Sequence, residues 1–137
     1  MQLGHFVDLV TDASRRDLSI NAMATEEVMD GIGRVHHVVL HDPFGGEADI
    51  ENKVLRHTSG AFMEDPVRVL RLARFRARFG PDWTVAKETR DIVHNMAKRG
   101  VLDNLQPDRI WKEMSRALME DHPRLFFDTL LECDALQ

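Results

Sequence analysis

The chain has 137 residues, of which 43% are apolar and 30% charged, so its composition is that of an ordinary globular protein and not of a disordered or fibrous one. The formal net charge of −5 argues against a generally basic nucleic-acid coat, so any contact with RNA or nucleotides must come from a local cluster of basic residues. Cys133 is the single cysteine, which excludes an intramolecular disulfide and favours a reducing, cytoplasmic environment, and no apolar run is long enough to span a membrane.

The first part of the chain is predicted to consist of short strands and one helix. Residues 5–10 are rich in strand formers, and a short helix is predicted to follow them and to run through Ala24. Two further strand-like runs, residues 27–29 and 35–41, are separated by an Asp-Gly-Ile-Gly turn signal. This arrangement predicts a β-hairpin.

The second part of the chain is predicted to be helical. After the hairpin and a loop, the sequence indicates a short helix at residues 47–52 and a strand at 54–57. From Pro66 onward the spacing of apolar residues becomes that of helices, which are predicted over residues 67–79, 86–98, 107–119 and 123–133. The sequence therefore predicts an α+β protein, with a β-rich unit at residues 1–60 and an all-helical unit at residues 61–137.

The predicted helix at residues 67–79 carries a stripe of arginines. At 100° per residue, Arg68, Arg71, Arg74 and Arg78 fall within an arc of about 120°, with apolar residues on both sides. Like charges at this spacing disfavour an isolated helix by about 0.2–0.5 kcal/mol per pair, so an anionic group should compensate them. Either a phosphate chain or a set of carboxylates would serve. A packed helix whose arginines simply pair with acidic residues is the alternative interpretation.

Asp65 and Arg68 could read the edge of a base together. Cytosine and adenine both present an exocyclic amino donor beside a ring-nitrogen acceptor, whereas uracil and guanine present the reverse order. One accepting carboxylate and one donating guanidinium could therefore select C and A, because the other bases would leave polar groups unpaired. Asp65 has an alternative role as the N-cap ahead of Pro66, and Glu64 could simply complement the helix dipole.

Two sequence motifs resemble those of one known family. The stretch Glu-Asp-Pro-Val-Arg at residues 64–68, followed by Arg71 and Arg74, resembles the nucleotide-selecting motif of class II CCA-adding tRNA nucleotidyltransferases and the related bacterial poly(A) polymerases. Residues 15–24, Arg-Arg-Asp-Leu-Ser-Ile-Asn-Ala-Met-Ala, resemble the family's ribose- and triphosphate-contacting motif. Seen alone, the charged start of this second motif could equally be an exposed helix end.

A third motif makes the resemblance specific. Asp-Pro-Phe-Gly-Gly at residues 42–46, with Asp49, resembles the family's flexible loop motif, and the likeness continues through residues 107–113. It therefore covers nearly the whole chain and implies a partial nucleotidyltransferase head followed by a helical neck. The loop motif comprises Asp42, Gly45, Gly46 and Asp49, and the resemblance implies that Asp42 and Asp49 anchor a loop that shifts between addition of C and addition of A.

The resemblance also implies roles for individual residues in nucleotide binding. Arg16 would contact the triphosphate and Asp17 the ribose 2′-hydroxyl, while Asn21 would support their loop. In the second half of the site, the base template would be Asp65 and Arg68, with Arg71 and Arg74 near the phosphates. The substrates implied are CTP and ATP.

The family's reaction implies Mg²⁺, bound by an Asp-x-Asp strand after a Gly-Gly-x-x-Arg-Asp turn. Fourteen residues precede Arg15, and none of them supplies this turn or this strand. The sequence therefore predicts no catalytic residue and no established metal ligand, with Asp8 only a weak candidate. A zinc site at His36, His37 and His41 is not expected, because neighbouring side chains on a strand point to opposite faces.

Several functional hypotheses stay open at this point. The first is a split or truncated enzyme that selects CTP and ATP for transfer to the 3′-end of tRNA or another RNA, with a separate chain carrying the catalytic motif. A poly(A) polymerase is the second, since both groups share these motifs. A non-catalytic remnant that binds nucleotide or RNA, or an accessory module that docks through an exposed strand edge, is the third. In each case the chain alone is expected to be inactive.

Overall fold

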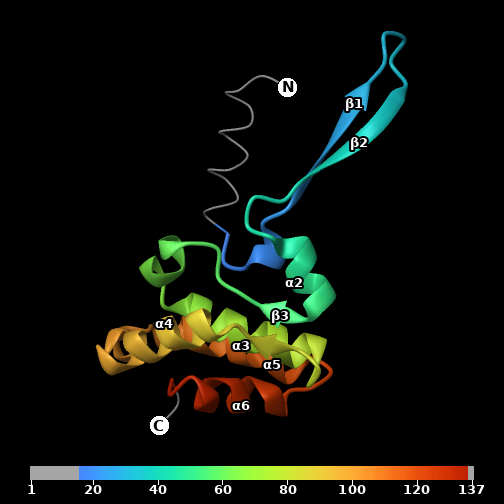
Figure 1. Ribbon diagram of the computed structural model, residues 1–137. Coiled ribbons are helices and arrows are strands. Elements are labelled where there is room, and N and C mark those ends of the chain that lie inside the picture. Colours follow the sequence, from blue (N-terminus) through green and yellow to red (C-terminus); the bar gives the residue numbers. More distant parts are fainter. Residues whose placement is uncertain (1–15, 136–137) are drawn as a thin grey trace.

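The computed structural model describes residues 16–135, so the predicted strand at residues 5–10 and the candidate ligand Asp8 lie outside the described residues. An antiparallel hairpin, β1 (Ala24–Met29) and β2 (Val35–His41), projects away from the helices (Figure 1). In its turn the Asp30 carboxylate accepts two hydrogen bonds from backbone amides, each 2.9 Å long. The predicted hairpin is therefore confirmed, with its first strand beginning at Ala24 and not at residue 27.

The prediction of a helix that runs through Ala24 is wrong for the described residues. Only a 3₁₀ turn, η1 (Ser19–Asn21), forms before the chain enters β1. The reason is tertiary pairing, because the Ser19 amide donates to the Arg56 carbonyl at 2.9 Å and Leu18 forms a β-bridge with His57. Such long-range contacts override the weak local helix preference of this segment.

A short helix and two short strands join the hairpin to the helical part. Helix α2 (Gly46–Asn52) and strand β3 (Val54–Leu55) were both predicted, although the strand is shorter than expected. β3 pairs in parallel with β4 (Thr84–Val85), which the sequence did not predict. Two residues are too few to show the alternation that marks a strand.

All four predicted helices after Pro66 are confirmed, with ends that differ by at most one residue. They are α3 (Val67–Phe79), α4 (Lys87–Lys98), α5 (Pro107–Leu118) and α6 (Arg124–Glu132). Two 3₁₀ turns were not predicted: η2 (Gly60–Glu64), which precedes α3, and η3 (Val101–Asn104), which lies between α4 and α5. None of the helices in residues 16–135 is both long enough and apolar enough to cross a membrane.

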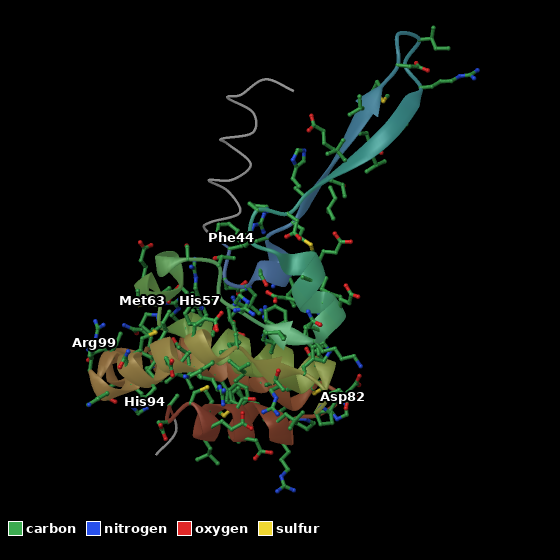
Figure 2. The ribbon with its side chains drawn as sticks, in the orientation of Figure 1. Phe44, His57, Met63, Asp82, His94 and Arg99 are labelled. Atoms are coloured by element: carbon green, nitrogen blue, oxygen red, sulfur yellow. The ribbon has the colours of Figure 1, made fainter. Side chains whose placement is uncertain are left out.

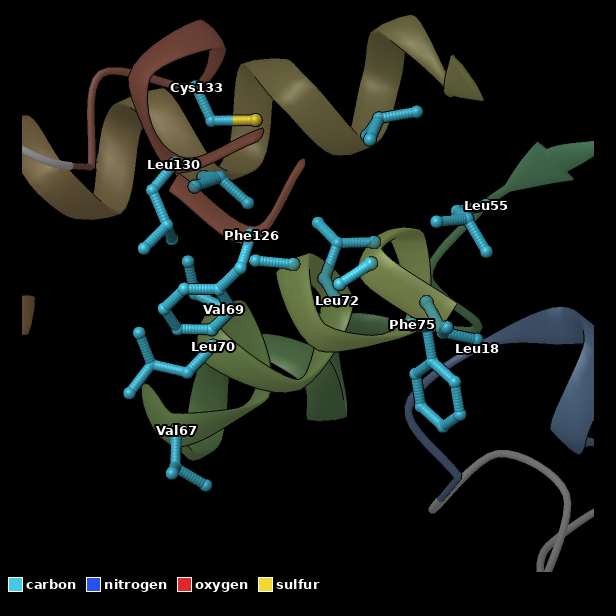
Figure 3. Close-up of a cluster of buried hydrophobic side chains, with 14 of the residues drawn as sticks. Leu18, Leu55, Val67, Val69, Leu70, Leu72, Phe75, Phe126, Leu130 and Cys133 are labelled. Carbon is cyan, nitrogen blue, oxygen red and sulfur yellow. The ribbon is translucent and has the colours of Figure 1, made fainter. Parts of the chain in front are cut away.

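Helix α3 is the centre of the apolar core. It packs against both α5 and α6, and its buried side chains meet Phe126, Leu130 and Cys133 of the last helix and its end (Figure 3). Leu18 and Leu55 from the first part of the chain join the same cluster (Figure 3). The fold is thus α+β, as predicted, with short strands and a helix packed on a helical unit. The exact division at residue 60 stays a prediction.

Candidate functional site

Asp17 lies in the turn before η1 and contacts α3, and only 4% of its surface is exposed. One carboxylate oxygen, Oδ1, accepts hydrogen bonds from the Leu18 amide at 2.9 Å and from Nδ2 of Asn21 at 3.4 Å. The other, Oδ2, lies 3.0 Å from Nη2 of Arg71, but no donor of the described residues is aligned with it as a hydrogen bond. The structure therefore brings together three predicted site residues, Asp17, Asn21 and Arg71.

Asp65 precedes α3 and contacts α5. It lies one residue ahead of the N-cap Pro66, where its Oδ1 accepts a hydrogen bond from the Val67 amide at 3.2 Å and its Oδ2 accepts one from Nη2 of Arg109 at 2.8 Å. Partial burial would raise the pKa of Asp65, but the hydrogen bonds from Arg109 and Val67, together with the charges of Arg109 and Arg68, hold that pKa below its ordinary value. Asp65 is therefore an ionised acceptor at neutral pH.

Arg74 is compensated by a carboxylate from the neighbouring helix. Its Nε lies 2.7 Å from Oε2 of Glu113 on α5, and both side chains are largely buried. The N–H does not point at the oxygen, so the contact is an ion pair and not a hydrogen bond. Asp17 and Glu113 are thus the anionic partners of two arginines in the predicted stripe, as the alternative interpretation of that stripe expected.

A pocket of about 420 Å³ lies between the beginning of α3 and α5. Five basic side chains line it against two carboxylates, so its charge is positive, and such a pocket suits an anionic ligand such as a phosphate chain. Arg71 lines this pocket and also pairs with Asp17, so it joins the pocket to the turn before η1. The residues that line the pocket are Asp65, Val67, Arg71, Arg74, Arg109, Lys112, Glu113 and Arg116.

The loop motif at residues 42–46 leads into helix α2, whose first residue is Gly46. Asp42 accepts hydrogen bonds from the amides of Gly46 at 2.6 Å and of Glu47 at 3.0 Å, so it satisfies two amides of the first helical turn from a position ahead of the N-cap Gly45. Gly45 has a φ of 74°, which suits glycine. A Cβ at Gly46 would lie 2.3 Å from the carbonyl oxygen of Ser19, so only glycine allows this close approach. The loop therefore rests on η1, and Phe44 lies at the base of the hairpin (Figure 2).

Asp49 holds α2 against the same turn. It is 6% exposed and accepts hydrogen bonds from Oγ of Ser19 at 2.6 Å and from Nε of Arg56 at 3.2 Å. The predicted loop residues are thus contacts that fix α2, and they do not line the pocket between α3 and α5. Within residues 16–135, no three His, Cys, Asp or Glu side chains converge on a point where a metal ion could bind. His41 instead contacts Glu26 at 2.8 Å.

Comparison with known proteins identifies the family. A model described as "Poly A polymerase head domain" matches residues 2–56, and one described as "Probable RNA and SrmB- binding site of polymerase A" matches residues 82–137. The chain is 52% identical over 132 residues to the multifunctional CCA protein of Acinetobacter baumannii strain AYE, covering 96% of this chain and 30% of that protein. The chain belongs to the family of CCA-adding tRNA nucleotidyltransferases and bacterial poly(A) polymerases.

Other relatives of this nucleotidyltransferase family agree with the assignment. The multifunctional CCA protein of Janthinobacterium sp. strain Marseille is 50% identical over 131 residues, which cover 96% of this chain and 29% of that protein. The chain thus spans about three tenths of the length of these curated relatives.

Solved structures of the family share the fold. A Thermotoga maritima CCA-adding enzyme complexed with tRNA matches with a TM-score of 0.76 and 28% identity, over 93% of this chain and 30% of that one. A CCA-adding enzyme complexed with CTP matches with a TM-score of 0.77 and 28% identity, over 93% and 29% of the two chains. One complexed with ATP matches with a TM-score of 0.74 and 29% identity, over 91% and 28%.

Four residues that line the pocket between α3 and α5 were not predicted as site residues. They lie on α5, where the sequence predicted a helix and a resemblance to the family's neck but no binding site. Their spacing of three, four and seven residues places them on one helical face, and this charged row was a signal that could have found them. The four residues are Arg109, Lys112, Glu113 and Arg116.

Proposed function

We propose that this chain is the nucleotide-selecting part of a CCA-adding tRNA nucleotidyltransferase, which transfers nucleotides from CTP and ATP to an RNA 3′-end. The observation that carries the proposal is the positive pocket between α3 and α5, where the ionised Asp65 stands among arginines. The proteins of similar fold include CCA-adding enzymes complexed with tRNA, with CTP and with ATP, which supports the same function for this chain.

The base would be read by Asp65 and Arg68. Asp65 stays ionised at neutral pH, so it can only accept a hydrogen bond, as the amino groups of C and A require. Arg68, whose charge also lowers the pKa of Asp65, would supply the donor beside this acceptor. Uracil and guanine would place an oxygen against the carboxylate and leave it unpaired, which is how such a pair discriminates.

The phosphates and the sugar would be bound on either side of Arg71. Arg71 and Arg74 line the pocket together with the basic residues of α5, and these supply positive charge for a triphosphate. Asp17 lies on the other side of Arg71, where its carboxylate would accept the ribose 2′-hydroxyl, and Arg16 is the preceding, exposed residue. Asn21 supports this turn through its contact with Asp17.

The described residues do not fit the Mg²⁺ that the family's reaction implies. No suitable cluster of ligands occurs among residues 16–135, and the carboxylates of Asp17 and Asp65 are each held by an arginine. We therefore assign this part of the chain a role in binding and orienting the nucleotide. The metal-binding carboxylates would come from sequence that corresponds to the rest of the relatives' length, on the same polypeptide or on a separate chain.

Poly(A) addition is a second candidate function, which the name of the matching head-domain family favours. The proposed pair of Asp65 and Arg68 suits both C and A, so it does not by itself separate the two reactions. A poly(A) polymerase would bind ATP and discriminate against CTP. Binding of CTP therefore decides between the two candidates.

The test is nucleotide binding to the full chain, measured by calorimetry with CTP, ATP, UTP and GTP. We expect CTP and ATP to bind and UTP and GTP to bind at least tenfold more weakly, with the selectivity lost in Asp65→Ala and in Arg68→Ala. Asp91→Ala and Arg99→Ala are matched controls, since both residues are exposed on or at the end of α4.

Three results would decide against parts of the proposal. Equal binding of all four nucleotides, or unchanged selectivity in both variants, would contradict the base template. Selective binding of ATP alone would favour the poly(A) function. A chain that selects C and A but transfers no nucleotide when it is combined with the rest of a relative's sequence would be a binding module without catalysis.

A further inference from the structure

The turn that contains Arg16 and Asp17 is held by the segment that follows β3. Beside the Leu18 bridge to His57 and the Ser19 amide bond to Arg56, the Thr58 amide donates to the Asp17 carbonyl at 3.2 Å. This backbone ladder does not depend on the side chain at position 58. It therefore fixes the path of the turn whatever residue occupies that position.

The Thr58 hydroxyl makes a contact that depends on the residue type. It donates a hydrogen bond to the carbonyl oxygen of Arg16, with Oγ1 and O 2.5 Å apart. Thr58 thus bonds both residues of the turn, Asp17 through its amide and Arg16 through its hydroxyl. The hydroxyl therefore holds the peptide group between Arg16 and Asp17, and the amide holds the following one, between Asp17 and Leu18.

The segment is anchored in turn on helix α4. The amide of His57 donates to Oγ1 of Thr89 at 3.1 Å, and Nδ1 of His57 lies 2.7 Å from the same oxygen. Burial and the neighbouring charge of Arg56 lower the pKa of His57, which favours the neutral ring at neutral pH, and in the tautomer protonated on Nε2 the Nδ1 atom accepts from the hydroxyl. Thr89 is fully buried, and Figure 2 shows His57 where this segment meets the helical layer.

We propose that Thr58 is a positioning residue for the ribose and triphosphate of the bound nucleotide. Its hydroxyl orients the peptide group between Arg16 and Asp17, and so places the guanidinium and the carboxylate that the proposed function assigns to these two parts of the ligand. The base template has separate contacts, because Asp65 is fixed by the Val67 amide and Arg109. Thr58 therefore acts on recognition of the sugar and phosphates and not on selection of the base. This inference rests on the proposed function.

The experiment compares the full chain with Thr58→Val, which removes the hydroxyl and keeps the shape, and with Thr58→Ser, which restores the hydroxyl. CTP, dCTP and UTP are titrated into each protein. We expect Thr58→Val to bind CTP about two- to tenfold more weakly, the change for one lost hydrogen bond, and dCTP with a smaller loss. The preference for CTP over dCTP then falls, the preference for CTP over UTP is retained, and Thr58→Ser behaves like the original chain.

The outcomes separate this inference from the function on which it rests. Unchanged CTP affinity and an unchanged ratio of CTP to dCTP in Thr58→Val would overturn the inference alone, as would an equal loss for CTP, dCTP and UTP, which would show that Thr58 has no effect on recognition of the ribose. No binding of CTP by the original chain would overturn the proposed function and the inference together. Thermal unfolding monitors the fold, and Thr58→Ala replaces the valine variant if valine prevents folding.

Discussion

Nη2 of Arg71 lies 3.0 Å from Oδ2 of Asp17, and the same arginine lines the pocket between α3 and α5. One side chain thereby connects the turn before η1, where sugar contacts are proposed, to the pocket proposed for base and phosphates. The connection crosses 54 positions of sequence, from residue 17 to residue 71. Its strength can be measured without any ligand.

Removal of Arg71 is expected to destabilise the fold, because it leaves the nearly buried Asp17 carboxylate without its cation. We expect Arg71→Ala to lower the free energy of unfolding by about 1–3 kcal/mol, a range below that of fully buried pairs since Arg71 is half-buried. Urea denaturation measures the change. Adding Asp17→Asn to Arg71→Ala should recover part of the lost stability, because burying a neutral amide costs less free energy than burying a charged carboxylate. A single variant within 0.5 kcal/mol of the original chain, about the scatter expected of a surface substitution, would contradict the prediction.

Gly46 is expected to tolerate no side chain. A Cβ there would lie 2.3 Å from the Ser19 carbonyl oxygen, so backbone must move, and we expect Gly46→Ala to cost about 1–3 kcal/mol of unfolding free energy. Gly31→Ala is the matched control, because nothing lies within 4 Å of the corresponding Cβ in the hairpin turn. Thermal unfolding of both variants gives the comparison. Equal effects of the two substitutions would show that the approach of α2 to η1 is looser than described.

Lys112 of α5 is expected to act on phosphates and not on bases. Lys112→Ala should weaken CTP and ATP by the same factor, about two- to fivefold, since both ligands carry the same triphosphate and each exposed charge contributes modestly. The loss should shrink as salt is added, because screening weakens contacts between exposed charges. Lys98→Ala on α4 is the control, and calorimetry at two salt concentrations is the measurement. A loss confined to one of the two nucleotides would assign Lys112 to base recognition instead.

The titration of Asp65 is expected to depend on Arg109. Burial alone would raise the pKa of Asp65, but the hydrogen bond and charge of Arg109 bring it below the ordinary 3.8. A carboxylate with a lowered pKa in the folded state stabilises the fold above its unfolded pKa, and this contribution is lost as pH falls through the folded pKa. The stability advantage of the original chain over Arg109→Gln should therefore be present at neutral pH, begin to decline as the pH falls below about 3.8, and be lost below the folded pKa.

The check on Asp65 is carbon NMR of its carboxyl group during an acid titration. We expect a midpoint below 3.8 in the original chain and a higher one in Arg109→Gln. Identical midpoints in the two proteins would mean that the contact between Arg109 and Asp65 is not kept in solution.

Much of the fold could be predicted from local sequence patterns. The four long helices and the hairpin were predictable because apolar spacing, proline at helix starts and turn residues act within a few positions of the chain. The helix expected through Ala24 failed for the opposite reason, since the pairing of Leu18 with His57 lies outside any local window. The two-residue pairing of β3 with β4 was missed because it joins segments about thirty positions apart and is too short to leave a pattern.

By itself, the sequence determined the family motifs, the α+β class and the residue types of the candidate site, because these depend on short runs of the chain. It predicted that the arginines of α3 need anionic partners, but left open which ones. Only the tertiary structure decided that Asp17 pairs with Arg71, Glu113 with Arg74 and Asp65 with Arg109. Electrostatic attraction depends on distance in space and not on separation in the sequence, so the packing of α3 on α5 and on the turn before η1 determines these pairs.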